Sequence, residues 1–441
     1  MRLSRRRFLQ LCGVSALFGP SLSLSGCSDS TDEGVVPTSA EGSAMAPPRP
    51  AQFIRLNDLG SAPNAEGAIG TAGQLISFGQ ISDTHITLDD FSVTGNLALE
   101  SLLDSFGDNI GFGGLDRPQP QERYDVDVLQ AIVKTMNAVV PPLDLIVHTG
   151  DAIDAGVMTE LVSFLGEINQ SGLPWLQAIG NHDRLALGNI RPSLAENLSS
   201  LDFVDTGQFI REHFFRHHVP TELMFGSMAM GFDFGPGFNG DPNSVKGFYA
   251  FSPVAPVRDV SNVLVQPGVR FYVLESTLDA GSAEGGVSDE QISWLAGQLD
   301  QHTDSLAIVI SHHRLNDLTI GRDDLVGVLF DHPQVIAVLS GHDHTHRIRA
   351  FPVSGEPHRG FWQIQTSSLI DFPQQARILE VINNADGTGI IRTFVFNQQA
   401  TGQLGENARA SYESSIDDPF NGEGAAEDRD VELLFQFPQM T

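Results

Sequence analysis

Five short clusters of Asp, His and Asn side chains, each directly after a short apolar run, constrain this chain more than any other feature. In chain order they are Asp83-Thr84-His85, Gly150-Asp151-Ala152-Ile153-Asp154, Gly180-Asn181-His182-Asp183, His312-His313 and Gly341-His342-Asp343-His344. The apolar runs have the length of strands, and strand ends can bring distant sequence positions together. The pattern therefore predicts one polar site along the edge of a layered fold.

The residue types in these clusters are those that bind transition metals. Carboxylate oxygens and imidazole nitrogens are ligands of Zn, Mn and Fe. Residues two apart in an extended segment, such as Asp83 and His85, point the same way and can reach one metal centre. One cluster alone is weak, because an isolated buried His more often completes a core than binds a metal. Five clusters in one order favour a metal site over a purely structural role.

Apolar runs rich in Val, Ile and Phe alternate with segments of helical period, which is typical of an α/β fold. The expected strands are 75–81, 143–148, 175–179, 270–274, 306–310, 335–339, 362–365, 378–382 and 390–396. The expected helices are 125–139, 158–170, 289–301 and 323–330. Two segments near 87–123 and 190–268 do not fit this alternation. We expect them to be loops or insertions over one face of the sheet, where an α/β protein usually shapes its substrate site.

The first 26 residues have the pattern of an export signal. Arg5 and Arg6 match the twin-arginine pattern, and the apolar run that follows is too short and too interrupted to span a bilayer permanently. The sequence Leu24-Ser25-Gly26-Cys27 resembles the bacterial lipoprotein processing box, in which Cys27 is lipidated after cleavage. A basic N-terminus with an incidental Cys is the alternative. We therefore expect twin-arginine export and a periplasmic or cell-surface lipoprotein anchored to a membrane through Cys27.

Composition then divides the rest of the chain. Residues 27–72 are rich in Ser, Thr, Gly, Ala and Pro and predict a flexible tether. Residues 73–397 are long enough for one large or two medium domains, and the acidic, Gly-rich segment 398–441 is expected to be loosely ordered. Apart from Cys12 in the signal and the lipidated Cys27, no thiol remains for a disulfide.

The charge balance argues against nucleic acid as a partner. The chain has 55 acidic and 25 basic residues, for a formal net charge of −30. Such a surface repels polyanions, so any phosphate-bearing ligand would have to be captured by metal ions or by a few placed arginines. The sequence does not indicate the oligomeric state.

Together, the five clusters resemble those of the calcineurin-like metallophosphoesterase superfamily, and the resemblance covers about residues 75–395. It implies a two-sheet β-sandwich flanked by helices, with two divalent or trivalent metal ions (Fe, Mn or Zn) at the strand ends. One metal would be held by Asp83, His85, Asp151 and His344, and the other by Asp151, Asn181, His312 and His342, with Asp151 bridging the two.

The resemblance also implies roles beyond the ligands. His182 is expected to reach the scissile phosphate as an acid or transition-state stabiliser, and Asp154 to orient it, although Asp154 could instead be an exposed loop acid. Asp154 stands where purple acid phosphatases have a metal-binding Tyr, which argues against a tyrosinate-bound iron. His313, beside the ligand His312, is expected behind the ligands or in contact with the substrate. Arg184, and less strongly Arg314, which could instead extend to solvent, are expected to contact the phosphate.

The implied activity is hydrolysis of a phosphate monoester or diester by a metal-activated water. Both reactions use this ligand set, so the sequence leaves the choice open. One alternative is a non-catalytic exported lipoprotein that uses the same fold to bind a ligand or metal. Another is a metal-delivery lipoprotein, which would explain the ligands but not the pairing of His182 with Asp154.

Overall fold

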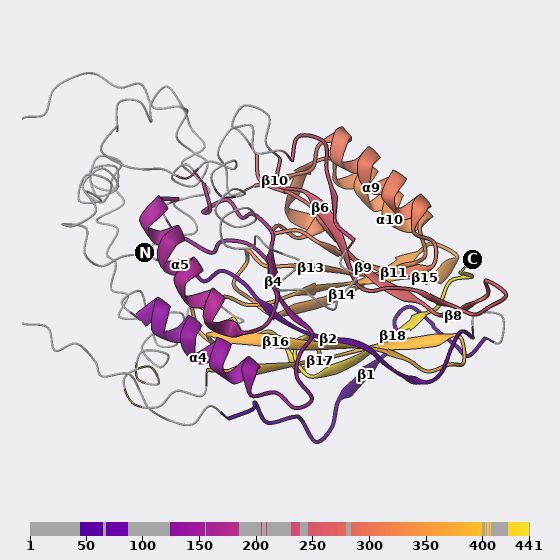
Figure 1. Cartoon of the computed structure of the whole chain (residues 1–441), viewed down its shortest axis with the longest axis horizontal. Coiled ribbons are helices and arrows are strands. Elements are labelled where there is room, and N and C mark those ends of the chain that lie inside the picture. Colours follow the sequence, from indigo (N-terminus) through magenta and orange to yellow (C-terminus); the bar gives the residue numbers. More distant parts are fainter. Residues whose placement is uncertain are drawn as a thin grey trace, which may run out of the picture.

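The computed structural model describes residues 45–64, 68–86, 124–154, 156–184, 231–238, 246–278, 284–398 and 422–440, with the single residues 204, 209, 402, 404 and 406. Within these residues, two seven-stranded sheets lie face to face as the layers of a sandwich (Figure 1). Phe78 of one sheet packs edge-to-face on Phe271 of the other, with ring centroids 5.2 Å apart. Both inner faces are apolar, so their contact forms the main core. The expected two-sheet fold is confirmed.

The first sheet is mixed. In spatial order its strands are β1 (Ile54–Leu56), β18 (Val431–Gln436), β17 (Thr388–Asn397), β16 (Gln375–Asn383), β2 (Gly73–Ile81), β3 (Leu145–His148) and β4 (Trp175–Gln177). β2, β3 and β4 run parallel, whereas β2, β16, β17 and β18 alternate in direction. The carboxyl ends of the three parallel strands consequently lie along one edge, directly before the first three polar clusters.

The second sheet has a parallel centre. In spatial order its strands are β14 (Arg347–Val353), β15 (Glu356–Gln365), β13 (Val335–Ser340), β11 (Ser305–Ile310), β9 (Gly268–Val273), β6 (Tyr249–Val254) and β5 (Asp233–Phe234). β15, β13, β11 and β9 are parallel neighbours. The last two polar clusters directly follow β11 and β13, so both sheets contribute strand ends to the site.

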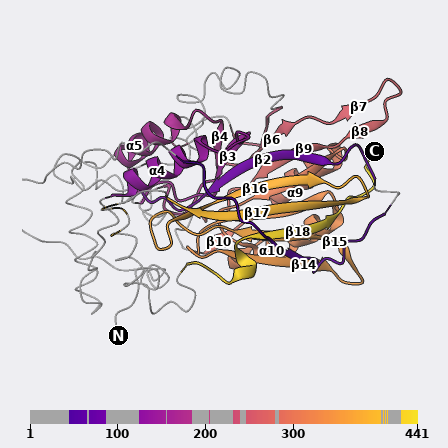
Figure 2. The ribbon, with the colours of Figure 1, turned by 90° about the horizontal axis from the view of Figure 1, so that it is seen from below.

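Four described α-helices cover the sheets (Figures 1 and 2). α4 (Asp125–Asn137) and α5 (Met158–Ile168) flank the parallel part of the first sheet, where Met136 of α4 packs directly on Gly79 of β2. α9 (Asp289–Gln301) and α10 (Arg322–Asp331) share a second apolar cluster with the second sheet. All four were expected within two residues of these bounds. No helix among the described residues is long and apolar enough to cross a bilayer.

The expectation of a loosely ordered tail at 398–441 is wrong for its last part. β18 pairs antiparallel with β17 and parallel with β1. Val431, Leu433, Phe435 and Phe437 are all buried, whereas the residues between them are partly exposed. This alternation is the signature of a strand with one face in the core, and the acidic composition around it concealed the signal.

The expected tether is also shorter than 27–72. Its second half crosses the first sheet, adds β1 to the edge and buries Leu59 completely. A row of alternating charges spans β1, β18, β17 and β16. Its members are Arg55, Glu432, Arg392 and Glu380 in neighbouring strands, with Arg49 pairing Glu380 at 2.6 Å. Opposite charges directly across strands stabilise such a sheet, so the domain begins well before residue 73.

The predicted range of the second insertion, near 190–268, extends too far along the chain. Its last part contains β5, β6 and the hairpin of β7 (Val257–Arg258) and β8 (Leu264–Gln266). β6 pairs with β9 inside the second sheet and is therefore part of the core fold. Segment 87–123, most of 190–230, and the signal with Cys27 lie outside the described residues.

Candidate metal centre

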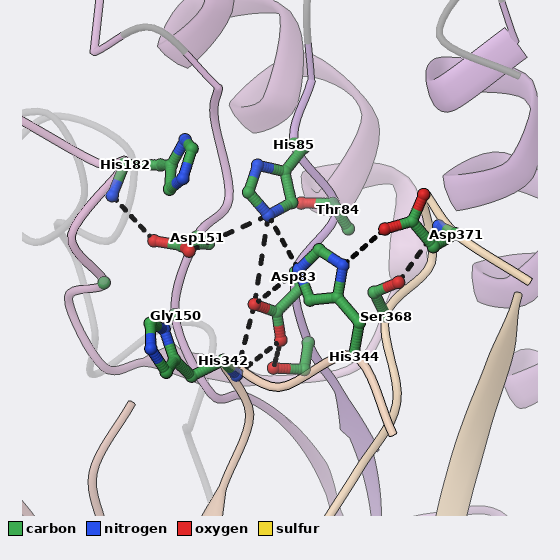
Figure 3. Close-up of polar contacts among 12 residues, drawn as sticks. Asp83, Thr84, His85, Gly150, Asp151, His182, His342, His344, Ser368 and Asp371 are labelled. Atoms are coloured by element: carbon green, nitrogen blue, oxygen red, sulfur yellow. Dashed lines mark hydrogen bonds and ion pairs between the residues drawn. The ribbon is translucent and has the colours of Figure 1, made fainter. Parts of the chain in front are cut away.

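The five polar clusters converge at one edge of the sandwich. Figure 3 shows residues of four of them, without the His312-His313 pair. Backbone hydrogen bonds join their loops: the Asp83 N–H donates to the Gly150 carbonyl over 3.0 Å, and the Gly341 N–H donates to the His312 carbonyl over 3.0 Å. An isolated bridge between Ile86 and Ile153 extends the pairing of β2 and β3 beyond both strands. Positions up to 261 residues apart in sequence thus form one continuous lining.

One group of ligand atoms, which we call the first half-site, consists of Asp83, His85, Asp151 and His344. His85 Nε2 lies 3.2 Å from His344 Nε2, 3.9 Å from Asp83 Oδ1 and 3.7 Å from Asp151 Oδ2. His344 Nε2 lies 3.3 Å from Asp83 Oδ1. These are the four residues that the sequence assigns to one metal.

The second half-site consists of Asp151, Asn181, His312 and His342. His312 Nε2 lies 3.1 Å from Asp151 Oδ2, 3.2 Å from Asn181 Oδ1 and 3.2 Å from His342 Nδ1. Asp151 Oδ2 is therefore close to ligand atoms of both half-sites. This is the position required of a bridging carboxylate.

Both half-sites fit a metal ion. Ligand atoms about 2.1 Å from a shared ion lie roughly 3 to 3.4 Å from one another. The three distances in the second half-site and two of the four in the first fall in that range, whereas His85 Nε2 lies 3.7 and 3.9 Å from the two carboxylates. Asp83, Asp151 and His312 are fully or almost fully buried, so their polar atoms face one another and not solvent.

The backbone around the site is strained. Of the eight described non-glycine residues with positive φ, five are candidate ligands: Asp83, His85, Asp151, His342 and His344. Each such residue costs on the order of 1 kcal/mol or more. The chain maintains these conformations because surrounding contacts determine them, which is typical of a functional site.

The glycines of the clusters act partly through their small size. Gly150 has φ +100, a conformation that favours glycine, and a Cβ there would come within 2.5 Å of His312 Nδ1. At Gly180 and Gly341 φ is not positive, but a Cβ would overlap Asp151 and Ser82, respectively. Gly150 therefore permits a sharp turn of the backbone, whereas the other two glycines allow loops to pack closely.

Electrostatic coupling draws positive charge into the site. Burial raises the pKa of Asp83, but the neighbouring His344 outweighs this and holds the pKa at about 2. Burial lowers the pKa of His344, and the charge of Asp83 reverses this and raises it to about 10. Burial also lowers the pKa of His312, and the charge of Asp151 reverses this and raises it to about 9. Cations are thus strongly favoured between the two carboxylates.

His182 lies at the border of the two half-sites. Its backbone N–H donates to Asp151 Oδ1 over 2.8 Å (Figure 3). Its ring Nδ1 lies 2.8 Å from the Asp154 carbonyl oxygen. A carbonyl only accepts hydrogen bonds, so Nδ1 carries the proton in this contact and Nε2 is the other ring nitrogen. His85, Asp151 and His182 bring ligand atoms within 4.8 Å of one another.

Asp154 is buried and not an exposed loop acid. One of its carboxylate oxygens lies 3.0 Å from His85 Nδ1 and 3.4 Å from His182 Nδ1. The expected partnership with His182 is thus accompanied by a shorter contact to a candidate metal ligand. Asp154 is placed to orient both imidazoles.

Sequence reasoning missed two carboxylates behind the ligands. Asp371 Oδ2 lies 2.5 Å from His344 Nδ1, opposite the nitrogen that faces the first half-site (Figure 3). The Asp183 carboxylate accepts backbone N–H groups of Asp151, Ala152, Ile153 and Gly180, which ties two cluster loops together. Asp183 had a signal in its cluster, whereas Asp371 had none.

The remaining expected site residues have partners within the protein. Arg184 Nη1 lies 3.4 Å from Glu275 Oε1 in a buried pair. Arg314 pairs with Asp317 and Asp343 and does not extend to solvent as a lone side chain. His313 Nδ1 lies 2.9 Å from the Ser276 hydroxyl oxygen, which accepts the His313 backbone N–H. His346, to which no role was assigned, is also buried and contacts Arg377 and Gln375.

Comparison with known proteins agrees with this geometry. The family model described as calcineurin-like phosphoesterase matches residues 76–346. A protein of Arcobacter nitrofigilis, named as a probable glycerophosphodiester phosphodiesterase GpdQ, is 24% identical over 232 residues, which make up 50% of this chain and 64% of that relative.

Solved structures show a more distant likeness. A dimetal phosphatase from Danio rerio aligns over 74% of this chain and 100% of its own, with a TM-score of 0.44 and 13% identity. Purple acid phosphatase PPD1 from yellow lupin aligns over 74% of this chain and 52% of its own, with a TM-score of 0.38 and 13% identity. The family model spans more than half of the sequence and all five polar clusters. This chain belongs to the calcineurin-like phosphoesterase family.

Proposed function

We propose that this protein is a metal-dependent phosphoric ester hydrolase that cleaves a small phosphate monoester or diester at two metal ions. The observation that carries the proposal is the pair of half-sites that share Asp151, with ligand atoms 3.1 to 3.9 Å apart. When bound there, two ions would act as Lewis acids on phosphoryl oxygens and lower the pKa of water.

The chain itself would supply positioning and proton transfer. Asp83 and Asp151 would provide the negative charge that holds the ions, and Asp151 would be shared by the two half-sites. The His182 ring is oriented by its Nδ1 contact to the Asp154 carbonyl. We propose that His182 protonates or stabilises the departing oxygen, with the Asp154 carboxylate supporting the imidazolium.

The ligand set also supports a proposal on metal identity. Four histidines, two carboxylates and one amide suit Fe, Mn or Zn better than Ca or Mg, which prefer oxygen ligands alone. Asp154, at the position of the metal-binding Tyr in purple acid phosphatases, contacts His85 and so gives no support to a tyrosinate ligand.

The experiment that tests the function combines metal analysis with hydrolysis. Purified protein would be analysed for bound metal and assayed with p-nitrophenyl phosphate and its bis-ester, before and after chelation. We expect about two ions per chain and metal-dependent release of p-nitrophenol. Two ions without any turnover of either ester would favour a non-catalytic binding protein, and fewer than two ions would contradict the dinuclear centre.

We further propose that the N-terminus exports the protein by the twin-arginine route and anchors it through Cys27. The support is the order of the twin arginines, apolar run and lipoprotein box in the sequence. Replacing Arg5 and Arg6 with Lys should retain the precursor in the cytoplasm, and Cys27→Ala should prevent lipid attachment. Wild-type protein that is soluble and unlipidated would refute the anchor without affecting the enzyme proposal.

A further inference from the structure

Two residues that are not metal ligands connect the loops of the second half-site. Arg314 lies two residues after His312, and Asp343 stands between His342 and His344. Arg314 Nη2 lies 2.6 Å from Asp343 Oδ2. We propose that this ion pair is a clamp that sets the spacing of His312 and His342 and thereby the metal affinity of the second half-site. The inference rests on the proposed function, because it assumes that a metal binds there.

The clamp is rigid on the arginine side. Arg314 Nε and Nη2 form a two-point contact with Asp317 at 2.6 and 2.7 Å, which fixes the plane of the guanidinium. The Leu315 N–H donates to Gln363 Oε1 over 3.0 Å and attaches the same loop to β15. The loop after β11 therefore presents the guanidinium in one orientation.

The aspartate side needs such support. His342 and His344, on either side of Asp343, both have positive φ, at 74 and 54. These conformations cost energy that contacts of the loop must offset. Asp343 contributes through Arg314 and through Arg347 Nη1 at 3.7 Å, and the His342 N–H donates to Asp83 on the opposite side.

Burial makes the pairing consequential. The Asp343 side chain is 6% exposed and that of Arg314 is 15% exposed. Losing one partner leaves the other charge largely desolvated, which is more costly than losing a surface pair. The Asp343 loop would then relax, and the 3.2 Å separation of His312 Nε2 from His342 Nδ1 would no longer be maintained.

The same contacts argue against a direct substrate role for Arg314. Two carboxylates already occupy its guanidinium, and the closest of their oxygens lie at 2.6 Å. An arginine held in this way acts through the ligands on both loops, as a positioning residue. Replacing Arg314 is therefore expected to weaken metal binding directly, and to change phosphate binding only as a consequence.

The test uses metal binding, which does not depend on turnover. Metal-free full-length protein would be titrated with Co²⁺, with stoichiometry measured after gel filtration and absorption bands recorded for each ion. Asn181→Ala and His344→Ala provide reference spectra for loss of the second and first half-site, respectively. Arg314→Met removes the charge at similar size, and Asp343→Asn removes the other partner.

We expect wild-type protein to bind two ions, and Arg314→Met to bind one ion normally and the other about 10- to 100-fold more weakly. With one equivalent of Co²⁺, the spectrum of Arg314→Met should match that of Asn181→Ala. The double variant Arg314→Met/Asp343→Asn should bind the second ion no more weakly than Arg314→Met alone, because it leaves neither charge without its partner. Arg359→Met, which loses an exposed pair with Glu356 at the far end of β15, is the matched control.

The outcomes separate this inference from the function on which it rests. Two ions of wild-type affinity in folded Arg314→Met, or equal weakening of both, would overturn the clamp. Failure of wild-type protein to bind two ions would instead overturn the dinuclear proposal. If Arg314→Met does not fold, Arg314→Lys retains the charge without the two-point contact, and selective weakening of the second ion is again the expected result.

Discussion

The two half-sites use similar ligands but differ in what lies behind them. In the first, His85 Nδ1 lies 3.0 Å from the Asp154 carboxylate and His344 Nδ1 lies 2.5 Å from that of Asp371. In the second, His312 Nδ1 lies 2.9 Å from the Thr149 carbonyl oxygen. A carboxylate behind a ligand makes the imidazole more basic, whereas a carbonyl mainly fixes its tautomer. We therefore expect the first half-site to bind its ion more tightly and the second to exchange more readily.

Removing the shared ligand should abolish the difference between the half-sites. Asp151→Ala deletes the carboxylate near both, so both ions should bind poorly and turnover should fall by about a thousandfold or more. Asn181→Ala should lower turnover comparably but leave the first ion bound. Hydrolysis of p-nitrophenyl esters, metal analysis and circular dichroism would test this. Wild-type turnover in either folded variant would exclude the dinuclear mechanism.

His182 should change catalysis without changing either half-site. His182→Ala is expected to retain both ions and to lose about 10²- to 10⁴-fold in turnover of esters with poor leaving groups, which need protonation most. Esters of p-nitrophenol should be affected less. A series of aryl phosphates of rising leaving-group pKa would measure the effect. An equal loss across the series would indicate phosphate binding in place of proton donation.

Asp371 provides a direct way to reduce the difference between half-sites. Asp371→Asn keeps the size of the side chain but removes the charge behind His344. The first ion should then bind about 10- to 100-fold more weakly, while the second is unchanged. Calorimetric titration of metal-free protein would measure both. Asp323→Asn, on the exposed surface of α10, is the control, and equal weakening of both ions would contradict the assignment.

The parts of the site that could be predicted are those in which the signal is local. Each apolar run and its polar cluster are contiguous, so strand, turn and ligand could be inferred together. Asp371 lies 27 residues beyond His344, and its contact depends on how β16 enters the first sheet. Nothing in the nearby sequence indicates that geometry.

The terminal segments show the opposite problem. Val431, Leu433 and Phe435 stand at every second position, with Glu432 and Gln436 beside them, but the surrounding acidic composition led to the wrong prediction. For the N-terminal segment, composition alone gave no indication that Arg49 would pair with Glu380 across 331 residues. Long-range charge pairing and edge-strand addition are tertiary effects, and local patterns do not report them.

The smallest expected effect is a difference in pH dependence between the half-sites. An imidazole must lose its proton before it binds a metal. The pKa of His344 is raised to about 10 and that of His312 to about 9, after Asp83 and Asp151 overcome the opposing effect of burial. In metal-free protein at pH 7 both rings are therefore protonated, and each ion should displace about one proton. Apparent affinity should rise about tenfold per pH unit until the relevant pKa is reached.

The two dependences should end at different pH values. Affinity of the second half-site should level off near pH 9, whereas that of the first should continue to rise towards pH 10. Proton release at pH 7 can be measured by calorimetry in two buffers of different ionisation enthalpy, with Asn181→Ala and His344→Ala isolating each half-site. If neither variant releases a proton, the imidazoles are already neutral and the carboxylates do not hold positive charge in the metal-free site. If a proton is released only in Asn181→Ala, which retains His344, then metal binding is coupled to protons in the first half-site alone. The half-sites would then differ more in pH dependence than their ligands suggest.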